Sequence, residues 1–203
     1  MPKQVDHDER RREIAGAVAR LAGKRGLAAV TFREVAAEAG MSVALVQHYF
    51  GSKQNLLLRT VDIVSGRMAE RFAARLSALG PGAGAIDRMR AVGVSFLPTD
   101  EDSREMMVLY HAVGAVGLTD PEIRGAQAHH NHGALISLLA GLLDAGRAAG
   151  EIAEDVEAVA EARMFTAAVT GLSAAVLLDA MSADEAIDAI DAHLRRLAAT
   201  PHR

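Results

Sequence analysis

This 203-residue chain contains no cysteine and no tryptophan, and only 3% of its residues are aromatic. The lack of cysteine excludes a disulfide scaffold, a cysteine nucleophile and any thiolate metal site. Because half of the residues are apolar, a disordered chain is excluded as well. A chain of this length can bury a sizeable core without covalent or metal staples, as one domain or two.

Long apolar runs are also missing. The N-terminus leads from Met1 into a charged run and lacks the apolar segment of a signal peptide. The most apolar later stretch, residues 167–178, is interrupted by polar residues and is shorter than the ~20 residues that a spanning helix needs. The sequence therefore predicts a cytoplasmic protein with no membrane partner.

The net charge of −4 by itself argues against a nucleic-acid partner, but the charge is unevenly distributed. Residues 1–60 hold ten basic and six acidic side chains, which gives +4. Residues 61–203 hold twelve basic and twenty acidic side chains, which gives −8. This asymmetry predicts a basic module joined to an acidic body.

The residues that dominate the chain are good helix formers, with 41 alanines among them, whereas alternating β-branched runs are scarce. Apolar periodicity and helix-terminus signals predict an all-α fold of about nine helices. The predicted ranges are 8–25, 32–39, 43–50, 53–79, 85–97, 101–116, 121–149, 156–179 and 183–198.

The run TFREVAAEAGMSVALVQHYF at residues 31–50 predicts two short helices joined by a tight turn. Thr31 and Glu34 have the spacing of a capping box, and Ser42 is a good N-cap for the second helix. Gly40 closes the first helix. Two such helices form a helix-turn-helix, whose second helix enters the major groove of DNA.

The second helix of this motif has two faces on a helical wheel of ~100° per residue. Val46 and Phe50 fall on one side and are expected to anchor the helix in the core. Ala44, Gln47 and His48 fall on the opposite arc. A surface helix with no partner usually carries Lys and Glu there, so this arc is a candidate DNA-contacting face.

The side chains of this arc suit the chemistry of a DNA groove. Gln47 is able to pair bidentately with adenine, and Leu45, at the edge of the arc, to touch a thymine methyl group. His48 and Tyr49 are able to donate to phosphate oxygens. Lys53 lies at the N-terminus of the next predicted helix, where backbone N–H groups also favour a phosphate.

These features resemble the DNA-binding domain of TetR-family (tetracycline-repressor-like) regulators. The resemblance rests on Gly26, on TFREVA at 31–36, on AGMS at 39–42, on HYF at 48–50 and on Ser52, Lys53, Leu56 and Leu57. It implies a homodimer that binds a palindromic operator of double-stranded DNA. The positions that it implies as DNA contacts are Thr31, Arg33, Ser42, Val43, Ala44, Gln47, His48, Tyr49 and Lys53.

The remainder of the chain is similar to the BetI-type, choline-responsive branch of that family. The matching stretches are 118–124, 145–152 and 171–182. The resemblance implies a ligand-binding and dimerisation domain, but it extends to architecture and not to ligand, so the effector stays unidentified. The candidate effector-pocket residues are Met68, Phe72, Phe96, Met107, Tyr110, His111, His129, Met164 and Phe165.

The last two predicted helices carry more apolar surface than one subunit covers. Small residues such as Gly171 allow helices to approach closely there. In the family these helices form a two-fold interface, and the resemblance implies the same in this chain. The candidate dimer residues are Ala168, Leu172, Ala175, Val176, Ile187, Ile190 and Leu194.

The sequence thus predicts a DNA-binding domain at 1–58 and an effector-binding and dimerisation domain at 59–203. The predicted function is a ligand-released repressor without enzymatic activity, cofactor or metal. Two alternatives stay open. One is a helical enzyme that uses His111 or a metal held by His129 and His132. The other is a helical interaction protein that does not bind DNA.

Overall fold

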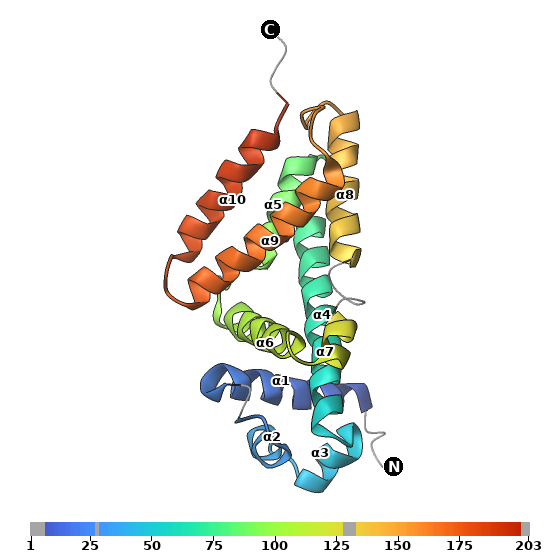
Figure 1. Cartoon of the computed structure of the whole chain (residues 1–203), viewed down its shortest axis with the longest axis vertical. Coiled ribbons are helices and arrows are strands. Elements are labelled where there is room, and N and C mark those ends of the chain that lie inside the picture. Colours follow the sequence, from blue (N-terminus) through green and yellow to red (C-terminus); the bar gives the residue numbers. More distant parts are fainter. Residues whose placement is uncertain (1–6, 27–28, 128–132, 200–203) are drawn as a thin grey trace. The chain divides into compact units, whose positions relative to one another are not determined.

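A computed structural model describes residues 7–26, 29–127 and 133–199, which form ten α-helices (Figure 1). Within these ranges no strand occurs, and one isolated bridge pairs Ile152 with Ala198. The predicted all-α fold is confirmed. The helices are α1 His7–Arg25, α2 Phe32–Ala39, α3 Val43–Phe50, α4 Lys53–Ala78, α5 Ala85–Ser95, α6 Glu101–Gly117, α7 Pro121–Gln127, α8 Gly133–Ala148, α9 Ala158–Leu177 and α10 Ala183–Leu197.

Most predicted helix ends lie within two residues of the observed ends, because local signals set them. Ser182 and Glu185 form the predicted capping box of α10, with both reciprocal hydrogen bonds present. Where the sequence predicts one helix over 121–149, the structure describes α7 and α8, with residues 128–132 outside the description. None of the described helices has the length and hydropathy needed to cross a membrane.

Contacts within the chain divide it into two compact units. The first unit comprises residues 1–66 and 108–128, and the second comprises 67–107 and 129–203. Helices α4 and α6 each contribute one part to each unit. The functional division at residues 58 and 59 stays a prediction, because a contact-based unit is not a test of function.

The first unit is built around α1, which packs against α2, which in turn packs against α3. Ile14 and Val18 of α1 are fully buried, and Val35 of α2 and Val46 of α3 are buried against the same core. Gly26 has φ of +75°, a left-handed conformation that ends α1 at the predicted residue. Three short helices therefore share one core, as a helix-turn-helix requires.

The second unit is built around α5, which contacts α8, α9 and α10. Met89 and Val92 of α5, Leu139 of α8 and Phe165 of α9 are almost completely buried. Gly93 lets α9 and α10 approach, since a Cβ atom there would lie 2.8 Å from Cζ of Phe165. In Figure 1, α9 and α10 form an antiparallel pair joined by a short connection.

We expect Gly93→Ala to destabilise the protein by about 1–3 kcal/mol, because the added methyl group overpacks the core against Phe165. Gly141→Ala is the matched control: Gly141 lies in α8, is exposed and has nothing near its Cβ position. This control is expected to be neutral or to stabilise by about 0.5–1 kcal/mol. Urea unfolding at one fixed protein concentration measures both. Equal effects of the two changes would contradict the close packing at Gly93.

Candidate nucleic-acid interface

Side-chain caps begin both α2 and α3, and a glycine ends α2 at the turn between them. Thr31 Oγ1 accepts a hydrogen bond from the N–H of Glu34 at 3.2 Å, and Ser42 Oγ accepts one from Leu45 at 3.1 Å. Gly40 has φ of +64°, and the N–H of Met41 donates to the carbonyl of Ala36 at 2.9 Å. This left-handed closure needs a glycine and sets the direction of α3.

One half of the predicted capping box at α2 is replaced by a contact between helices. The carboxylate of Glu34 forms an ion pair with Arg25 at the end of α1. A second pair joins Arg20 Nε to Glu38 at 2.8 Å. The hydrogen bond from Arg20 lowers the pKa of Glu38 below its ordinary value. The two pairs connect α2, and with it the turn, to α1.

Helix α3 separates its residues into two faces. Val46 is fully buried and Phe50 is 4% exposed, whereas Ala44, Gln47 and His48 are exposed. The sequence of α3, VALVQHYF, contains no Lys, Arg, Asp or Glu. A solvated helix face without any such residue is unusual, because charged residues normally occupy exposed positions. The outward face of α3 is therefore suited to contact a partner.

Tyr49 is held in place by two residues of α1, namely Arg11, which belongs to the basic run 10–12, and His7, which sequence reasoning did not identify. The Nδ1 atom of His7 lies 2.9 Å from the Tyr49 hydroxyl, and the Arg11 guanidinium lies 6.0 Å from the centre of the Tyr49 ring. The ring of His48 stands edge-on to it at 5.7 Å. The only sequence signal was the basic run 10–12 near the start of α1, which places cations close to the motif.

The other predicted contact residues are accessible. Thr31, Arg33, Ser42, Val43 and Lys53 are all exposed. Ser52 caps α4 through a hydrogen bond from the N–H of Asn55 at 3.0 Å, so Lys53 sits in the first turn of a long helix. Of the nine predicted contact positions, only Tyr49 is partly covered. Their role as DNA contacts stays a prediction.

The predicted effector residues are divided between the two units. Tyr110 and His111 belong to the first unit, where their rings meet edge-on at 5.4 Å and burial lowers the pKa of His111. In the second unit, Phe72 and Phe96 pair at 5.4 Å. Met68, Met107 and Phe165 are buried in that unit.

Two further predicted effector positions need separate comment. Met164 is 66% exposed whereas its neighbour Phe165 is 1% exposed, so Met164 points to solvent and Phe165 points into the core. His129 lies outside the described residues, as do His130 and His132, so the structure does not describe the predicted histidine cluster. Elsewhere in the described ranges no group of three or more His, Asp or Glu could hold a metal ion.

The predicted dimer residues fall into two sets. Val176, Ile190 and Leu194 are at most 6% exposed and belong to the core of their own subunit. Ile190, for example, packs towards Gly93 of α5. Ala168 is exposed, and the remaining three, Leu172, Ala175 and Ile187, are partly exposed.

A groove of about 470 Å³ runs between α9 and α10 in the second unit. Its lining is almost entirely apolar and includes Ala168, Leu172 and Ala175 of α9. His193 of α10 borders it, stacked on Phe165 and 2.7 Å from Glu161. The groove therefore adjoins the exposed members of the predicted dimer set.

Comparison with protein families gives two separate matches, one on each side of residues 61–84. Residues 14–60 match the family described as bacterial regulatory proteins, tetR family. Residues 85–199 match the family described as BetI-type transcriptional repressor, C-terminal. The second match alone covers more than half of the chain.

Individual relatives agree with these matches. The regulator PksA of Bacillus subtilis is 26% identical over 88% of this chain and 84% of its own length. The regulator BetI of Rhizobium meliloti is 40% identical over 78 residues. That match covers 38% of each chain, so this protein spans about two fifths of the BetI relative's length.

Solved structures share the fold at lower identity. A TetR-family regulator from Rhodococcus sp. has a TM-score of 0.84 at 24% identity, over 93% of this chain and 98% of that one. A regulator from Saccharomonospora viridis in complex with choline has a TM-score of 0.82 at 22% identity, over 95% and 100%. At these identities the likeness concerns the fold alone.

We expect His48→Ala to change the free energy of unfolding by no more than about 0.5 kcal/mol, because the side chain is exposed. Phe50→Ala, two residues later on the buried face, is expected to cost about 3–5 kcal/mol. Thermal or urea unfolding of the two variants measures the contrast. A loss of several kcal/mol in His48→Ala would show that this residue supports the fold and does not belong to a contact surface.

Proposed function

Because this chain belongs to the TetR family of bacterial regulatory proteins, with a BetI-type repressor C-terminal domain, it is a ligand-responsive, DNA-binding transcriptional regulator, and we propose that it represses its targets as a homodimer. The dimer binds a palindromic operator and leaves it when a small molecule binds to the second unit. We propose that it acts in the cytoplasm, where a bacterial operator lies.

The observation that carries this proposal is the outward face of α3. Val46 and Phe50 fix the helix from behind, while Gln47 and His48 remain exposed beside Ala44, which allows close approach to a groove. Gln47 reads a base edge, and His48 donates to the phosphate backbone. Arg33 and Lys53 add phosphate contacts at the N-terminal ends of α2 and α4.

The proposed dimer forms through α9 and α10. Val159 and Met164 of α9 are 41% and 66% exposed, and Leu178, the residue that follows the helix, is 78% exposed. Between them lies Gly171, whose Cβ position is open, so a second helix can approach closely. Exposed apolar surface of this kind marks an interaction site, and a two-fold axis makes it self-complementary.

Release from the operator follows from the spacing of the two α3 helices. They must enter successive major grooves about 34 Å apart. A ligand that binds more tightly to a dimer with another spacing shifts the population away from DNA. A coupling free energy of ~1–3 kcal/mol changes operator affinity about 5- to 150-fold. No observation in the described ranges favours the alternative of an enzyme.

The effector is not carried over from the choline complex of the Saccharomonospora viridis regulator. A quaternary ammonium group is held by exposed aromatic faces. In the described part of the second unit, Phe96 is 4% exposed and Phe165 is 1% exposed, and Phe72 pairs with Phe96. These rings are used for packing and do not form a cage.

We expect this protein to enrich a palindromic sequence from a random library of DNA duplexes. On the selected duplex, Gln47→Ala should cost about 1–3 kcal/mol of discrimination, because one bidentate base contact is lost. Lys53→Ala should weaken all sequences alike and lower the slope of log affinity against log salt by about 1. Fluorescence anisotropy across a salt series measures both effects.

Lys24→Ala is the matched control for Lys53→Ala. Lys24 is exposed in the last turn of α1 and lies outside the predicted contact set. Its removal should leave the salt slope unchanged. Binding that does not respond to salt, or a library from which no sequence is enriched, would overturn DNA as the partner.

We expect Met164→Glu to weaken the dimer about tenfold or more, because two-fold symmetry brings both new carboxylates into one interface. Leu118→Glu is the control: Leu118 is 79% exposed but belongs to the first unit, whereas α9 belongs to the second. Sedimentation equilibrium gives the dissociation constant of each variant. A dimer that tolerates both changes equally would place the interface on another surface.

A further inference from the structure

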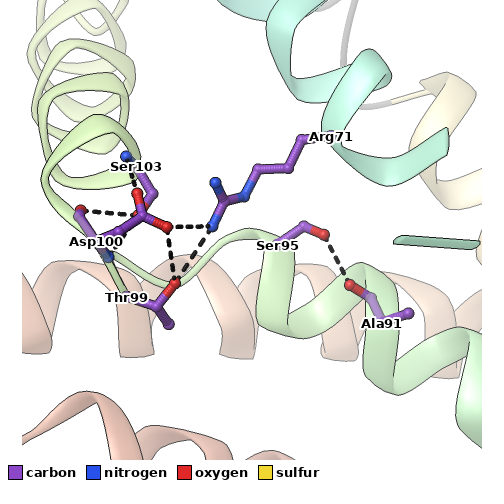
Figure 2. Close-up of polar contacts among 6 residues, drawn as sticks. All are labelled: Arg71, Ala91, Ser95, Thr99, Asp100 and Ser103. Carbon is purple, nitrogen blue, oxygen red and sulfur yellow. Dashed lines mark hydrogen bonds and ion pairs between the residues drawn. The ribbon is translucent and has the colours of Figure 1, made fainter. Parts of the chain in front are cut away.

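Two arginines of α4 lie one helical turn apart in the second unit, and the negative charge near them does not balance their positive charge. Arg71 extends from α4 to the start of α6, where its Nη2 atom lies 3.3 Å from Thr99 Oγ1 and 3.5 Å from Asp100 Oδ2 (Figure 2). Both hydrogen bonds are long. Arg75 follows at i+4, and neighbours of like charge at this spacing repel each other.

Arg71 is held loosely although little of it reaches solvent. Its side chain is 18% exposed, and its Nε atom is buried with no hydrogen-bond partner in the described part of the chain. Buried N–H donors are paired in nearly all proteins, and an exception calls for an explanation. The unused donor lies on a guanidinium group that is built to hold an oxyanion through two parallel hydrogen bonds.

Asp100 is a weak counter-ion for Arg71 because it mainly serves α6. Its Oδ1 atom accepts a hydrogen bond from the N–H of Ser103 at 2.7 Å, and its own N–H donates to Ser103 Oγ at 3.0 Å. Hydrogen bonding to the carboxylate by the backbone N–H and the side chain of Ser103, more than by Arg71, holds the pKa of Asp100 below its ordinary value. The Asp100 side chain is 54% exposed, so solvent screens its charge.

The other charged groups nearby do not balance the positive charge of Arg71 and Arg75. Arg90 is already paired with Asp191, through two hydrogen bonds of 2.6 and 3.1 Å. Burial and the charge of Arg71 lower the pKa of Arg75, for which no hydrogen bond or ion pair is recorded with the described residues. Arg71 and Arg75 therefore share one partial partner, Asp100.

An aromatic pair adjoins these cations. Phe72 follows Arg71 on α4, and its ring lies 5.4 Å from that of Phe96, three residues before Thr99. The connection between α5 and α6 therefore contacts α4 twice, through the Phe96–Phe72 ring pair and through the hydrogen bond of Thr99 with Arg71. Ser95, nearby in Figure 2, donates to the carbonyl of Ala91 at 2.7 Å, so its hydroxyl donor is already used.

We propose that Arg71 and Arg75 bind the carboxylate of a small organic acid whose apolar body packs beside Phe72, so that the effector of this regulator is an acid. This inference rests on the proposed function, in which the second unit is the one that binds the effector. A carboxylate matches the planar guanidinium fork and supplies the missing negative charge. The apolar part of the acid would pack against the ring of Phe72.

Such a ligand would act directly on α4. The carboxylate competes with Thr99 and Asp100 for Arg71, and these contacts connect α4 to the start of α6. Helix α4 is continuous from Lys53, a predicted phosphate contact, to Ala78. The ligand therefore replaces Thr99 and Asp100 as the partner of Arg71. The helix that carries Arg71 is the one whose first residue, Lys53, is a predicted DNA contact.

The test uses the full chain and three acids, benzoate, phenylacetate and octanoate, each beside its neutral amide. We expect at least one acid to raise the midpoint of thermal unfolding, because a ligand that binds the folded state stabilises it. The matching amide should not. The shift should disappear in Arg71→Met and in Arg75→Met, and should persist in Arg104→Met, an exposed arginine of α6 in the same unit.

Several results would overturn the inference. They are no shift with any acid, an equal shift with the amide, an equal shift with inorganic phosphate, or a shift that survives in both variants. If Arg71→Met does not fold, Arg75→Met and the acid–amide contrast decide. Operator binding is measured in parallel on the wild-type protein. A protein that binds its operator but no acid refutes this inference alone, whereas one that binds no DNA refutes the proposed function.

Discussion

Val46 and Phe50 anchor α3 in the core of the first unit, and their burial decides which side chains of that helix remain available to a partner. A rotation of α3 by half a turn would bury Gln47 and expose Phe50. The cap at Ser42 and the left-handed Gly40 reduce the freedom of the turn. The candidate DNA-contacting face is therefore a consequence of apolar packing behind it.

The second unit follows a different design. Its core is continuous around α5, and Gly93 lets Phe165 and Ile190 pack against the backbone of that helix. Charged side chains are kept to the borders of such a core because burial of an unpaired charge is costly. Arg71 is the exception, with its Nε atom buried and unpaired among the described residues. Helix α4, which carries Arg71, contributes to both units. A ligand that pairs with Arg71, as proposed above, therefore binds to a helix that also belongs to the first unit.

The charge is unevenly distributed along the chain. The first sixty residues carry +4, and the remainder carries −8. A positive field at the helix-turn-helix attracts the phosphate backbone, and an acidic body limits non-specific association with DNA. In the proposed complex with DNA, the exposed face of α3, which lacks Lys, Arg, Asp and Glu, supplies selectivity through hydrogen bonds and shape. In that proposal, affinity and selectivity come from different residues.

The sequence by itself determined the features that depend on neighbours within a few residues. The helices, the caps at Thr31, Ser42 and Ser182, and the glycine turn all follow from local backbone chemistry, and so do the two faces of α3. The family resemblance extended this to the architecture of the whole chain.

Only the tertiary structure decided the features that depend on contacts between distant residues. It placed Tyr110 and His111 in the first unit, and it turned Met164 outwards beside a buried Phe165. It also showed that Ile190 packs inside its own subunit, and it brought Arg71 to Asp100 across 29 positions of the chain. A helical pattern reports which residues share a face, but the partner of that face is set by the packing of the whole chain.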